Sequence, residues 1–461
     1  ARAGGTNYGT LAEFRTASGS DANSVTFDPQ YASDTNLTAS APGIASAGKN
    51  LLSVVPTDIN NDPRTATPSI GADQFSAAAL IPLNGTYTVG TGQTYTTINA
   101  AINAMKVNGI SGAVTFQLAS QTFTEQFVLP SISGSSATNT ITFQSQSGNA
   151  ANTILSFNAA AAATNYIAQL SNASFVTFRN LTLNPIGTSF NRAIHLINRA
   201  DDIRFENLVF NLPVTTSVTE DRAAILARPT LSSNLRFINN TITGGAYGIL
   251  HVGNSTNRSP GTVFTGNTIT NSYYRPAFFE SMQGGVFNNN TITNSVGAQF
   301  DYNGLAIQNT NGYMEILRNK ITGAVGHALR LQACAGVDTQ PSLVANNFLH
   351  SSGSSGYSAL EYRSSISHTL VYHNSVNQSG TGPAFYFNRG SSTGNRIVNN
   401  IFRANTGYAI SYDNAQIANS IIESDHNNLF TSGPFIARAG GTNYGTLAEF
   451  RTASGSDANS V

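Results

Sequence analysis

The second half of the chain repeats a short pattern of apolar and polar positions. Seven times in succession, an apolar residue is followed three places later by Asn and two places after that by another apolar residue, as in Phe237, Asn240 and Ile242. Together with a less regular eighth, the asparagines lie 27, 23, 29, 28, 27, 26 and 27 residues apart; they are Asn240, Asn267, Asn290, Asn319, Asn347, Asn374, Asn400 and Asn427. The pattern predicts a structural unit of about 27 residues that recurs along one axis.

The spacing of the two apolar residues predicts a bend at each Asn. They lie an odd number of positions apart, so a straight strand would direct them to opposite faces. A bend lets both face one core, and Asn is the non-glycine residue that best tolerates the left-handed conformation of a sharp bend. We therefore expect the asparagines to stack in one row and to hydrogen-bond between coils, at roughly 0.5–1.5 kcal/mol net per bond.

A second strand is expected after each Asn and a variable loop. Its form is a small residue followed by alternating apolar and variable positions, as in residues 304–308, 328–332 and 359–363. Alternation with a period of two is typical of a strand that faces a core on one side. Several short strands per turn, with bends between them, predict an all-β parallel β-solenoid whose coils pair about 4.8 Å apart.

These features resemble the right-handed parallel β-helix family of pectate lyases and pectin methylesterases. The stripe Ile98, Ala101, Ile102 and Met105 has helical spacing, and it resembles the short amphipathic helix that caps the N-terminal end of such proteins. Residues 58–64 and 70–75 resemble the closing motif of β-helix domains in giant secreted surface proteins of Bacteroidota-type bacteria. That resemblance implies type IX secretion and an extracellular or cell-surface location.

Residues 1–25 return without change as residues 437–461. This identity predicts a window cut from a tandem array, in which neighbouring repeat units of one chain are each other's partners. Residues 1–76 would form the C-terminal tail of a preceding unit, and residues 77–111 a linker and the N-terminal capping helix. Residues 112–436 would form the β-helix body, and residues 437–461 the start of the next copy of the tail.

Composition narrows the classes of partner. Only 10% of residues are charged, and 23 basic residues balance 23 acidic ones, so we expect neither nucleic-acid binding nor direct membrane insertion. Cys334 is the only cysteine, which excludes an internal disulfide. We expect it to be a buried structural thiol, because no base lies near it in its own coil.

The outward positions of the second strands give one candidate binding surface. Arg330, Glu361, Arg363, Tyr386 and Asn388 fall on neighbouring coils and form a candidate glycan-binding strip, although a merely solvated face has the same appearance. No two carboxylates fall side by side at the spacing that glycoside hydrolysis requires. The arginines beside Glu361 favour an ion pair over a perturbed catalytic acid.

The only candidate metal site is a short acidic turn. Asp58, Asn60 and Asp62 have the spacing of the first three ligands of a calcium loop, but Pro63 and Ser69 stand where an EF-hand needs Gly and Glu. Calcium is therefore the one cofactor considered, and a simple turn is the alternative. No other cofactor is expected.

Two functions of different classes remain. Tandem identity and the absence of an acid cluster favour a non-catalytic repeat unit of a long secreted adhesin or filament that contacts surface glycans or other filaments. On this interpretation the chain is not an enzyme. The alternative is a polysaccharide lyase or glycoside hydrolase on the same fold, since fold alone does not decide function.

Overall fold

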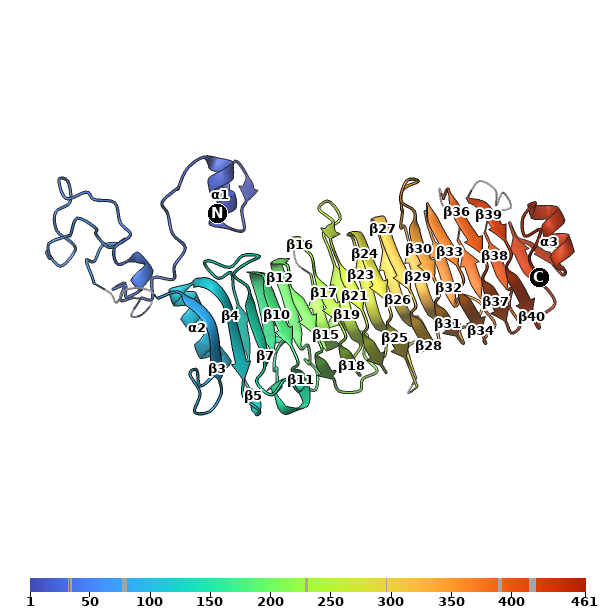
Figure 1. The fold of residues 1–461 in the computed structure, drawn as a ribbon, viewed down its shortest axis with the longest axis horizontal. Helices are drawn as coiled ribbons and strands as arrows, with labels where there is room; N and C mark the ends of the chain where they lie inside the picture. The colour runs from blue at the N-terminus through green and yellow to red at the C-terminus, as the bar shows by residue number, and fades with distance from the viewer. Residues whose placement is uncertain are drawn as a thin grey trace.

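The computed structural model describes residues 1–31, 33, 35–76, 81–228, 231–295, 297–388, 392–413 and 420–461. About 13 coils stack into an elongated solenoid, with three sheets running along its length (Figure 1). Neighbouring strands of these sheets are parallel, except in one terminal hairpin. The predicted all-β parallel β-solenoid of the right-handed type is confirmed, whereas the tandem array stays a prediction.

The first sheet carries the strand that precedes each bend. Its strands, in spatial order, are β3 (Leu83–Val89), β4 (Ile110–Leu118), β7 (Ile141–Ser145), β10 (Val176–Arg179), β13 (Arg204–Glu206), β17 (Arg236–Ile238), β21 (Val263–Thr265), β24 (Met282–Asn288), β27 (Asn311–Leu317), β30 (Ser342–Ala345), β33 (Thr369–Tyr372), β36 (Asn395–Val398) and β39 (Ile421–Asp425), with β20 (Ser259–Pro260) paired to β24. Strand β3 lies in the segment expected to hold only a linker and the capping helix, so the first sheet begins before that helix.

The second sheet follows each bend. Its strands are β5 (Thr122–Thr124), β8 (Ile154–Phe157), β11 (Thr182–Pro185), β14 (Val209–Asn211), β18 (Thr241–Thr243), β22 (Thr268–Thr270), β25 (Thr291–Thr293), β28 (Lys320–Ala324), β31 (Phe348–Ser351), β34 (Ser375–Gln378), β37 (Ile401–Ala404) and β40 (Asn428–Thr431).

The third sheet contains the alternating segments predicted after the variable loops. Its strands are β6 (Phe127–Leu129), β9 (Ala168–Ser174), β12 (Ile194–Asp201), β15 (Ala223–Ala227), β19 (Tyr247–Val252), β23 (Arg275–Glu280), β26 (Asn303–Gln308), β29 (His327–Gln332), β32 (Leu360–Arg363), β35 (Phe385–Phe387), β38 (Ile410–Tyr412), β41 (Ala437–Ala439) and β42 (Thr442–Tyr444), with β16 (Leu231–Ser233) paired to β12.

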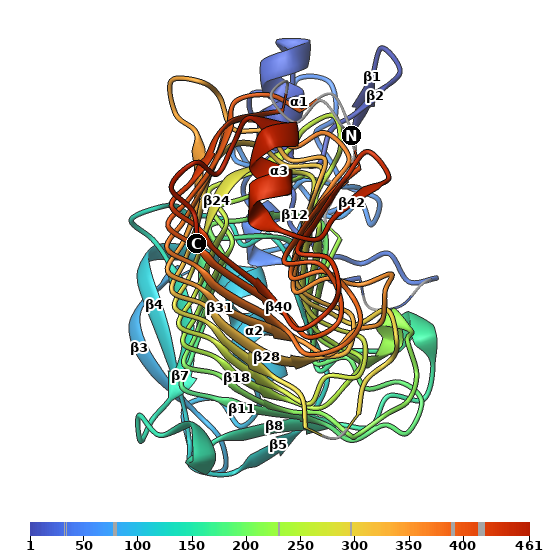
Figure 2. The ribbon, with the colours of Figure 1, turned by 90° about the vertical axis from the view of Figure 1, so that its right-hand side faces the viewer.

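Helices lie at the two ends of the solenoid. Helix α2 (Ile98–Asn108) buries the predicted stripe Ile98, Ala101, Ile102 and Met105. Helix α3 (Leu447–Ser454) lies across the opposite end, as Figure 2 shows. Helix α1 (Leu11–Ser18) and the hairpin β1 (Arg2–Ala3) and β2 (Thr6–Asn7) precede the solenoid, and short 3-10 turns are η1 (Pro42–Ile44), η2 (Ala150–Asn152), η3 (Ala162–Thr164) and η4 (Glu220–Arg222). In the described part of the chain, no helix is long and apolar enough to cross a membrane.

The core is a column of apolar side chains from successive coils. The rings of Phe143, Phe178, Phe205 and Phe237 stack with centroids 5.3, 6.1 and 5.6 Å apart. Each of these residues occupies the same inward position of the first sheet. Repetition of one apolar position therefore builds a continuous core without a large globular volume.

The repeated asparagines form one buried row at the bend between the first and second sheets. From Asn240 to Asn427 their exposure is 0–2%. Each Oδ1 from Asn267 onward accepts the backbone N–H and the Nδ2–H of the Asn one coil earlier, at 2.9–3.1 Å. Each Nδ2 also donates to a backbone carbonyl one coil earlier at 2.8–2.9 Å. We name this arrangement the asparagine row.

The left-handed residue of each bend is the one before the row, not the row asparagine itself. Asn239, Arg318 and His373 have φ values of 53°, 54° and 54°, and Gly266 has 69°. The row asparagines themselves are absent from the positive-φ positions. The expectation that they make the bend by adopting the left-handed conformation is therefore corrected: their task is to fill the buried hydrogen bonds that the bend leaves open.

Candidate functional site

The outward face of the third sheet changes character along the solenoid. One outward position pairs from coil to coil through Leu226, Leu250, Phe278, Ala306, Arg330, Glu361, Tyr386 and Ser411. The first four are apolar and buried beneath neighbours such as Tyr247. The column becomes polar and charged at Arg330. The alternation of the second strands thus brings the predicted strip together on adjacent coils.

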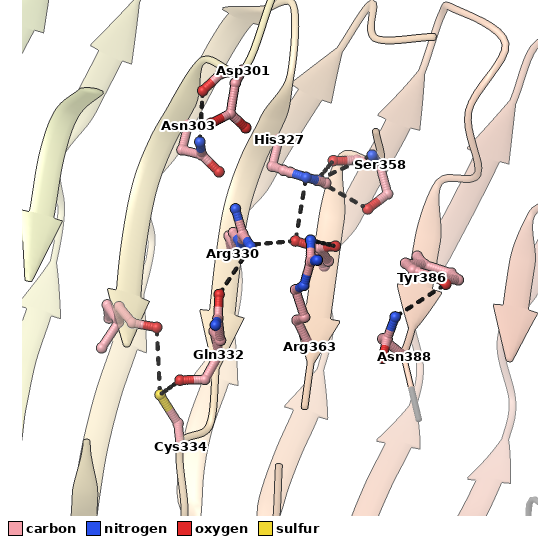
Figure 3. Close-up of polar contacts among 12 residues, drawn as sticks. Asp301, Asn303, His327, Arg330, Gln332, Cys334, Ser358, Arg363, Tyr386 and Asn388 are labelled. Carbon is pink, nitrogen blue, oxygen red and sulfur yellow. Dashed lines mark hydrogen bonds and ion pairs between the residues drawn. The ribbon is translucent and has the colours of Figure 1, made fainter. Parts of the chain in front are cut away.

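Glu361 is a charged side chain buried on this outward face. It is 2% exposed. Its Oε2 lies 2.9 Å from Arg330 Nε, and its Oε1 lies 3.8 Å from Arg363 Nη1 (Figure 3). Burial raises the pKa of Glu361, while the charges of Arg330 and then Arg363 oppose that increase. Burial therefore favours the neutral form of Glu361, whereas the two neighbouring guanidinium groups favour its carboxylate form.

The contacts of Glu361 are close but poorly aligned. Both Glu361 Oε2 and Arg330 Nε lack an aligned hydrogen-bond partner among the described residues, although both atoms are buried. Buried polar atoms are nearly always hydrogen-bonded in native proteins, so each exception requires an explanation. A cluster that is charged, buried and incompletely satisfied is typical of a functional site, although structural ion-pair networks also occur.

His327 contacts the same carboxylate from the start of strand β29. The Ser358 N–H donates to His327 Nδ1 at 3.2 Å. His327 Nε2 lies 3.2 Å from Glu361 Oε2. Burial, followed by the charge of Arg330, lowers the pKa of His327 to about 3. The ring is therefore neutral at pH 7, with Nε2 facing Glu361 and Nδ1 facing the backbone N–H, the carbonyl and the hydroxyl of Ser358.

Tyr386 links the buried cluster to the exposed edge of the strip. Its phenol donates to Asp413 Oδ1 at 2.7 Å and accepts from Asn388 Nδ2 at 3.2 Å. Burial and the Asp413 hydrogen bond raise the pKa of Tyr386 to about 12. Asp413 is exposed, and Arg363 has 48% of its side chain exposed. A neutral phenol, an exposed carboxylate and an exposed guanidinium thus lie on neighbouring coils.

Two participants were not predicted from the sequence. His327 is the first residue of strand β29 and Ser358 lies two residues before strand β32, so both stand where alternation gives little indication of direction. The signal that was present is the register: His327 pairs with Asn303 at the first position of strand β29. Any side chain there lies beside the outward column.

The remaining candidate residues have other surroundings. The Cys334 thiol is buried and donates to the carbonyls of Gln332 and Ile307 at 3.3 and 3.4 Å, and burial raises its pKa to about 12. In the proposed calcium turn, Asp58 accepts the backbone N–H groups of Gln74, Asn60 and Asp62 at 2.7–2.9 Å. Among the described residues, no group of three or more His, Cys, Asp or Glu could hold a metal ion. Calcium binding there stays a prediction.

A hollow of about 980 Å³ lies away from this strip. It is lined by Tyr8, Ala12, Asn172, Arg199 and Leu231, where helix α1 approaches the third sheet. The case for the Glu361 face therefore rests on burial and charge rather than on concavity.

Comparison with known proteins finds similar folds. No protein-family model matches the chain, and no curated protein matches its sequence. Among solved structures, a GH136 lacto-N-biosidase from Eubacterium ramulus has a TM-score of 0.42 at 10% identity, covering 70% of this chain and 64% of its own. A rhamnogalacturonan lyase has a TM-score of 0.37 at 9% identity, covering 58% and 81%. The periplasmic alginate epimerase AlgG has 0.40 at 10% identity, covering 71% and 75%.

The prediction that the chain is not an enzyme is wrong as stated, and we correct it. All three of these structures bear the names of enzymes, so membership of this fold class gives no ground for excluding catalysis. The absence of adjacent carboxylates excluded one geometry of glycoside hydrolysis, not the other reactions. At these identities and TM-scores the likeness shows the fold alone, and the chemistry has to be argued from this chain's own residues.

Proposed function

We propose that the chain is a polysaccharide-active enzyme whose site is the outward face of strands β29, β32, β35 and β38. The observation that carries the proposal is the buried, incompletely hydrogen-bonded Glu361 between two arginines, next to a neutral His327. Such a cluster is costly to maintain in a protein interior. It supports a role in holding Arg363 and Tyr386 at defined positions on the surface.

The reaction that these residues fit best is β-elimination in a uronic-acid polymer. Arg363 would bind the uronate carboxylate and so acidify the neighbouring C5–H. Asp413 would accept the C5 proton as the C4–O bond breaks and a C4=C5 double bond forms. Tyr386, whose raised pKa keeps it protonated, would donate its proton to the leaving oxygen.

The hydrogen bond between Tyr386 and Asp413 closes the proton cycle. After elimination, Asp413 is protonated and Tyr386 is a phenolate. Their oxygens lie 2.7 Å apart before reaction, so the proton can return directly. Glu361, Arg330 and His327 are positioning residues here, because Glu361 is too deeply buried to touch a sugar.

Incubation with polygalacturonate, alginate and other uronic-acid polymers tests the proposal. We expect ultraviolet-absorbing unsaturated products, and a loss of at least about 100-fold in rate for Asp413→Asn and Tyr386→Phe. Arg403→Ala is the matched control, since Arg403 is an exposed arginine on the second sheet whose guanidinium donates to Asn377 Oδ1 at 2.8 Å. New reducing ends without unsaturated products would show that the chain cleaves the polymer by hydrolysis and not by elimination. If none of the polymers gives any product, the proposal is contradicted.

We also propose that the chain acts outside the cell, as one of several similar units in a surface protein that contacts glycans. Two observations support this: residues 1–25 and 437–461 are identical in sequence, and both copies form the same hairpin and helix. Neighbouring units would be the partners, and repeated sites would raise the effective affinity for a long polymer. Labelling of intact cells with a membrane-impermeant reagent tests the location.

A further inference from the structure

Several tyrosines stand where the chain enters the third sheet, beside its outward face. Tyr247 is the first residue of strand β19, and Tyr274 directly precedes strand β23. Tyr357 and Tyr408 lie shortly before strands β32 and β38. Tyrosine combines a large flat ring with a polar end, so the contacts of each ring decide whether it serves the fold or can meet a ligand.

Three of these tyrosines are already engaged within the protein. Tyr247 is only 6% exposed. The guanidinium carbon of Arg275 lies 4.5 Å from the centroid of the Tyr274 ring, which it covers. The Tyr408 hydroxyl donates to Asn443 Oδ1 at 2.9 Å. Their contacts therefore account for these three side chains without a ligand.

Tyr357 differs from the other three. It is partly exposed, and its hydroxyl makes no hydrogen bond to any residue that the structure describes. Its ring packs against the His327 imidazole, with centroids 5.3 Å apart and planes at 64°. Burial and then the charge of Asp301 raise the pKa of the phenol, and the charges of Arg330 and Glu361 also act on it. The ring therefore lies beside the buried cluster, at the edge of the strip.

The backbone of Tyr357 is fixed from both sides. Its N–H donates to the Ser354 carbonyl at 2.9 Å, and its own carbonyl accepts from Gln378 Nε2 at 3.0 Å. A Cβ at Gly382 would lie 1.7 Å from the Tyr357 carbonyl oxygen, and one at Gly353 would lie 2.6 Å from Tyr357 Cβ. Glycine at both positions lets the loop close tightly. The ring is thus preorganised, which reduces the entropy that binding must overcome.

We infer that Tyr357 stacks on a sugar ring of the uronic-acid polymer and so extends the proposed site across the strip. The inference rests on the proposed function for the choice of ligand, but not on the elimination chemistry. The C–H groups on one face of a pyranose are weakly positive, and the face of an aromatic ring is negative.

Tyr357 and Arg363 bind different units of the polymer. Arg363 lies six residues after Tyr357 on the same coil, which corresponds to roughly 15–20 Å of extended chain. This separation is longer than one sugar ring. A long oligomer can therefore contact both side chains, whereas a dimer held by Arg363 does not reach Tyr357.

The test measures binding rather than turnover, in the full chain carrying Asp413→Asn so that the ligand is not consumed. Dimers and octamers of galacturonate and of alginate are titrated by calorimetry. We expect Tyr357→Ala to weaken octamer binding about fivefold to tenfold and to leave dimer binding within about twofold. Tyr357→Phe keeps the ring and should keep the affinity. Tyr372→Ala is the matched control, since Tyr372 is a partly exposed tyrosine on the first sheet.

Unchanged octamer affinity in Tyr357→Ala would overturn the inference, and so would a failure of every uronic-acid oligomer to bind. Equal losses for dimer and octamer, with a lower melting temperature in circular dichroism, would overturn it as well, because they indicate a structural role. If Tyr357→Ala does not fold, Tyr357→Leu replaces it in the same comparison. A selective loss of octamer binding in a protein whose unsubstituted form yields no product would support the inference and contradict the proposed elimination.

Discussion

The asparagine row and the Glu361 cluster are two ways of burying polar groups in one solenoid. The row is neutral, repeats in every coil from Asn240 onward, and its amide hydrogens are paired. The cluster is charged, occurs once, and leaves Glu361 Oε2 and Arg330 Nε without aligned partners. Burial of polar groups is harmless to stability when it is satisfied and costly when it is not. The first arrangement serves the fold, and the second matches the buried charged clusters that are typical of functional sites.

The largest effect is expected from breaking the row in its middle. Asn319→Ala removes the acceptor for the backbone N–H and for one Nδ2 hydrogen of Asn290, and leaves these two buried hydrogens unpaired, while the other Nδ2 hydrogen still donates to the Phe264 carbonyl. We expect a loss of about 4 kcal/mol in the free energy of unfolding, as each orphaned group costs roughly 1–3 kcal/mol. Urea denaturation followed by circular dichroism measures it. Asn211→Ala is the control, since its exposed amide donates to Asn184 Oδ1 at 3.0 Å; equal effects would refute the special role of the row.

Breaking the cluster should cost less than breaking the row. Glu361→Ala leaves Arg330 without its closest carboxylate, which we expect to destabilise the fold by about 3 kcal/mol. The Arg330 side chain is 10% exposed, so part of the guanidinium can regain water. Replacing both residues with Leu, as in the apolar coils of the same column, should restore stability to within about 1 kcal/mol. A double variant as unstable as the single one would show that the cluster is needed for folding.

The buried side chain of His251 should make the stability of the fold depend on pH. His251 is fully buried on an inward position, and burial lowers its pKa from 6.5 to about 4. Because the folded pKa is the lower one, the unfolded chain takes up this proton first, and stability falls as the pH drops from 6.5 toward 4. At pH 5 the loss is about 2 kcal/mol relative to pH 7.

The variant His251→Leu tests this value, since Leu fills a position that is occupied by Phe279 one coil later. Unfolding free energies at pH 7 and pH 5 should differ by about 2 kcal/mol less in the variant than in the wild type. The contribution of Asn240 to the unfolding free energy should be the same at pH 7 and pH 5, because its amide side chain takes up no proton in this range. Identical pH profiles for the variant and the wild type would contradict a neutral buried His251.

The smallest effect on stability is expected at the exposed edge of the cluster. Arg363 is half exposed and 3.8 Å from Glu361, so Arg363→Ala should change the unfolding free energy by less than about 0.5 kcal/mol. The same variant should lose activity toward uronic-acid polymers, whereas Arg403→Ala should not. A large loss of stability would show that Arg363 serves the fold, as the asparagine row does, and would contradict its assignment to the functional site.

Periodicity was enough to predict the coils of the solenoid and the helical stripe of residues 98–105, whereas the capping role of that helix came from the resemblance to the β-helix family. One position per coil carries the core, so a recurrent apolar residue identifies the inward face without knowledge of long-range contacts. The bend was assigned one residue too late because several coils have Asn at both positions, as in Asn239 and Asn240. The Gly266–Asn267 pair held the better signal, since Gly at the first position indicates where the left-handed conformation is required.

The candidate site was predicted only in part. The outward alternation placed Arg330, Glu361 and Tyr386 on one face, because a strand fixes the direction of its side chains. It could not indicate that Glu361 is buried, since burial there depends on His327 and on the loop that brings Ser358 to it. Contacts made by turns of different lengths leave no periodic trace in a sequence.

The asparagine row also gives the rod a direction. Each backbone N–H of the row points to an oxygen of the coil that comes after it in the chain, so a partly synthesised solenoid always ends in donors that await the next coil. At Asn427 the partners are Ser460 Oγ and Asp457 Oδ1 in place of another asparagine. The row therefore gives the solenoid a polarity along its axis, with each N–H directed toward the following coil.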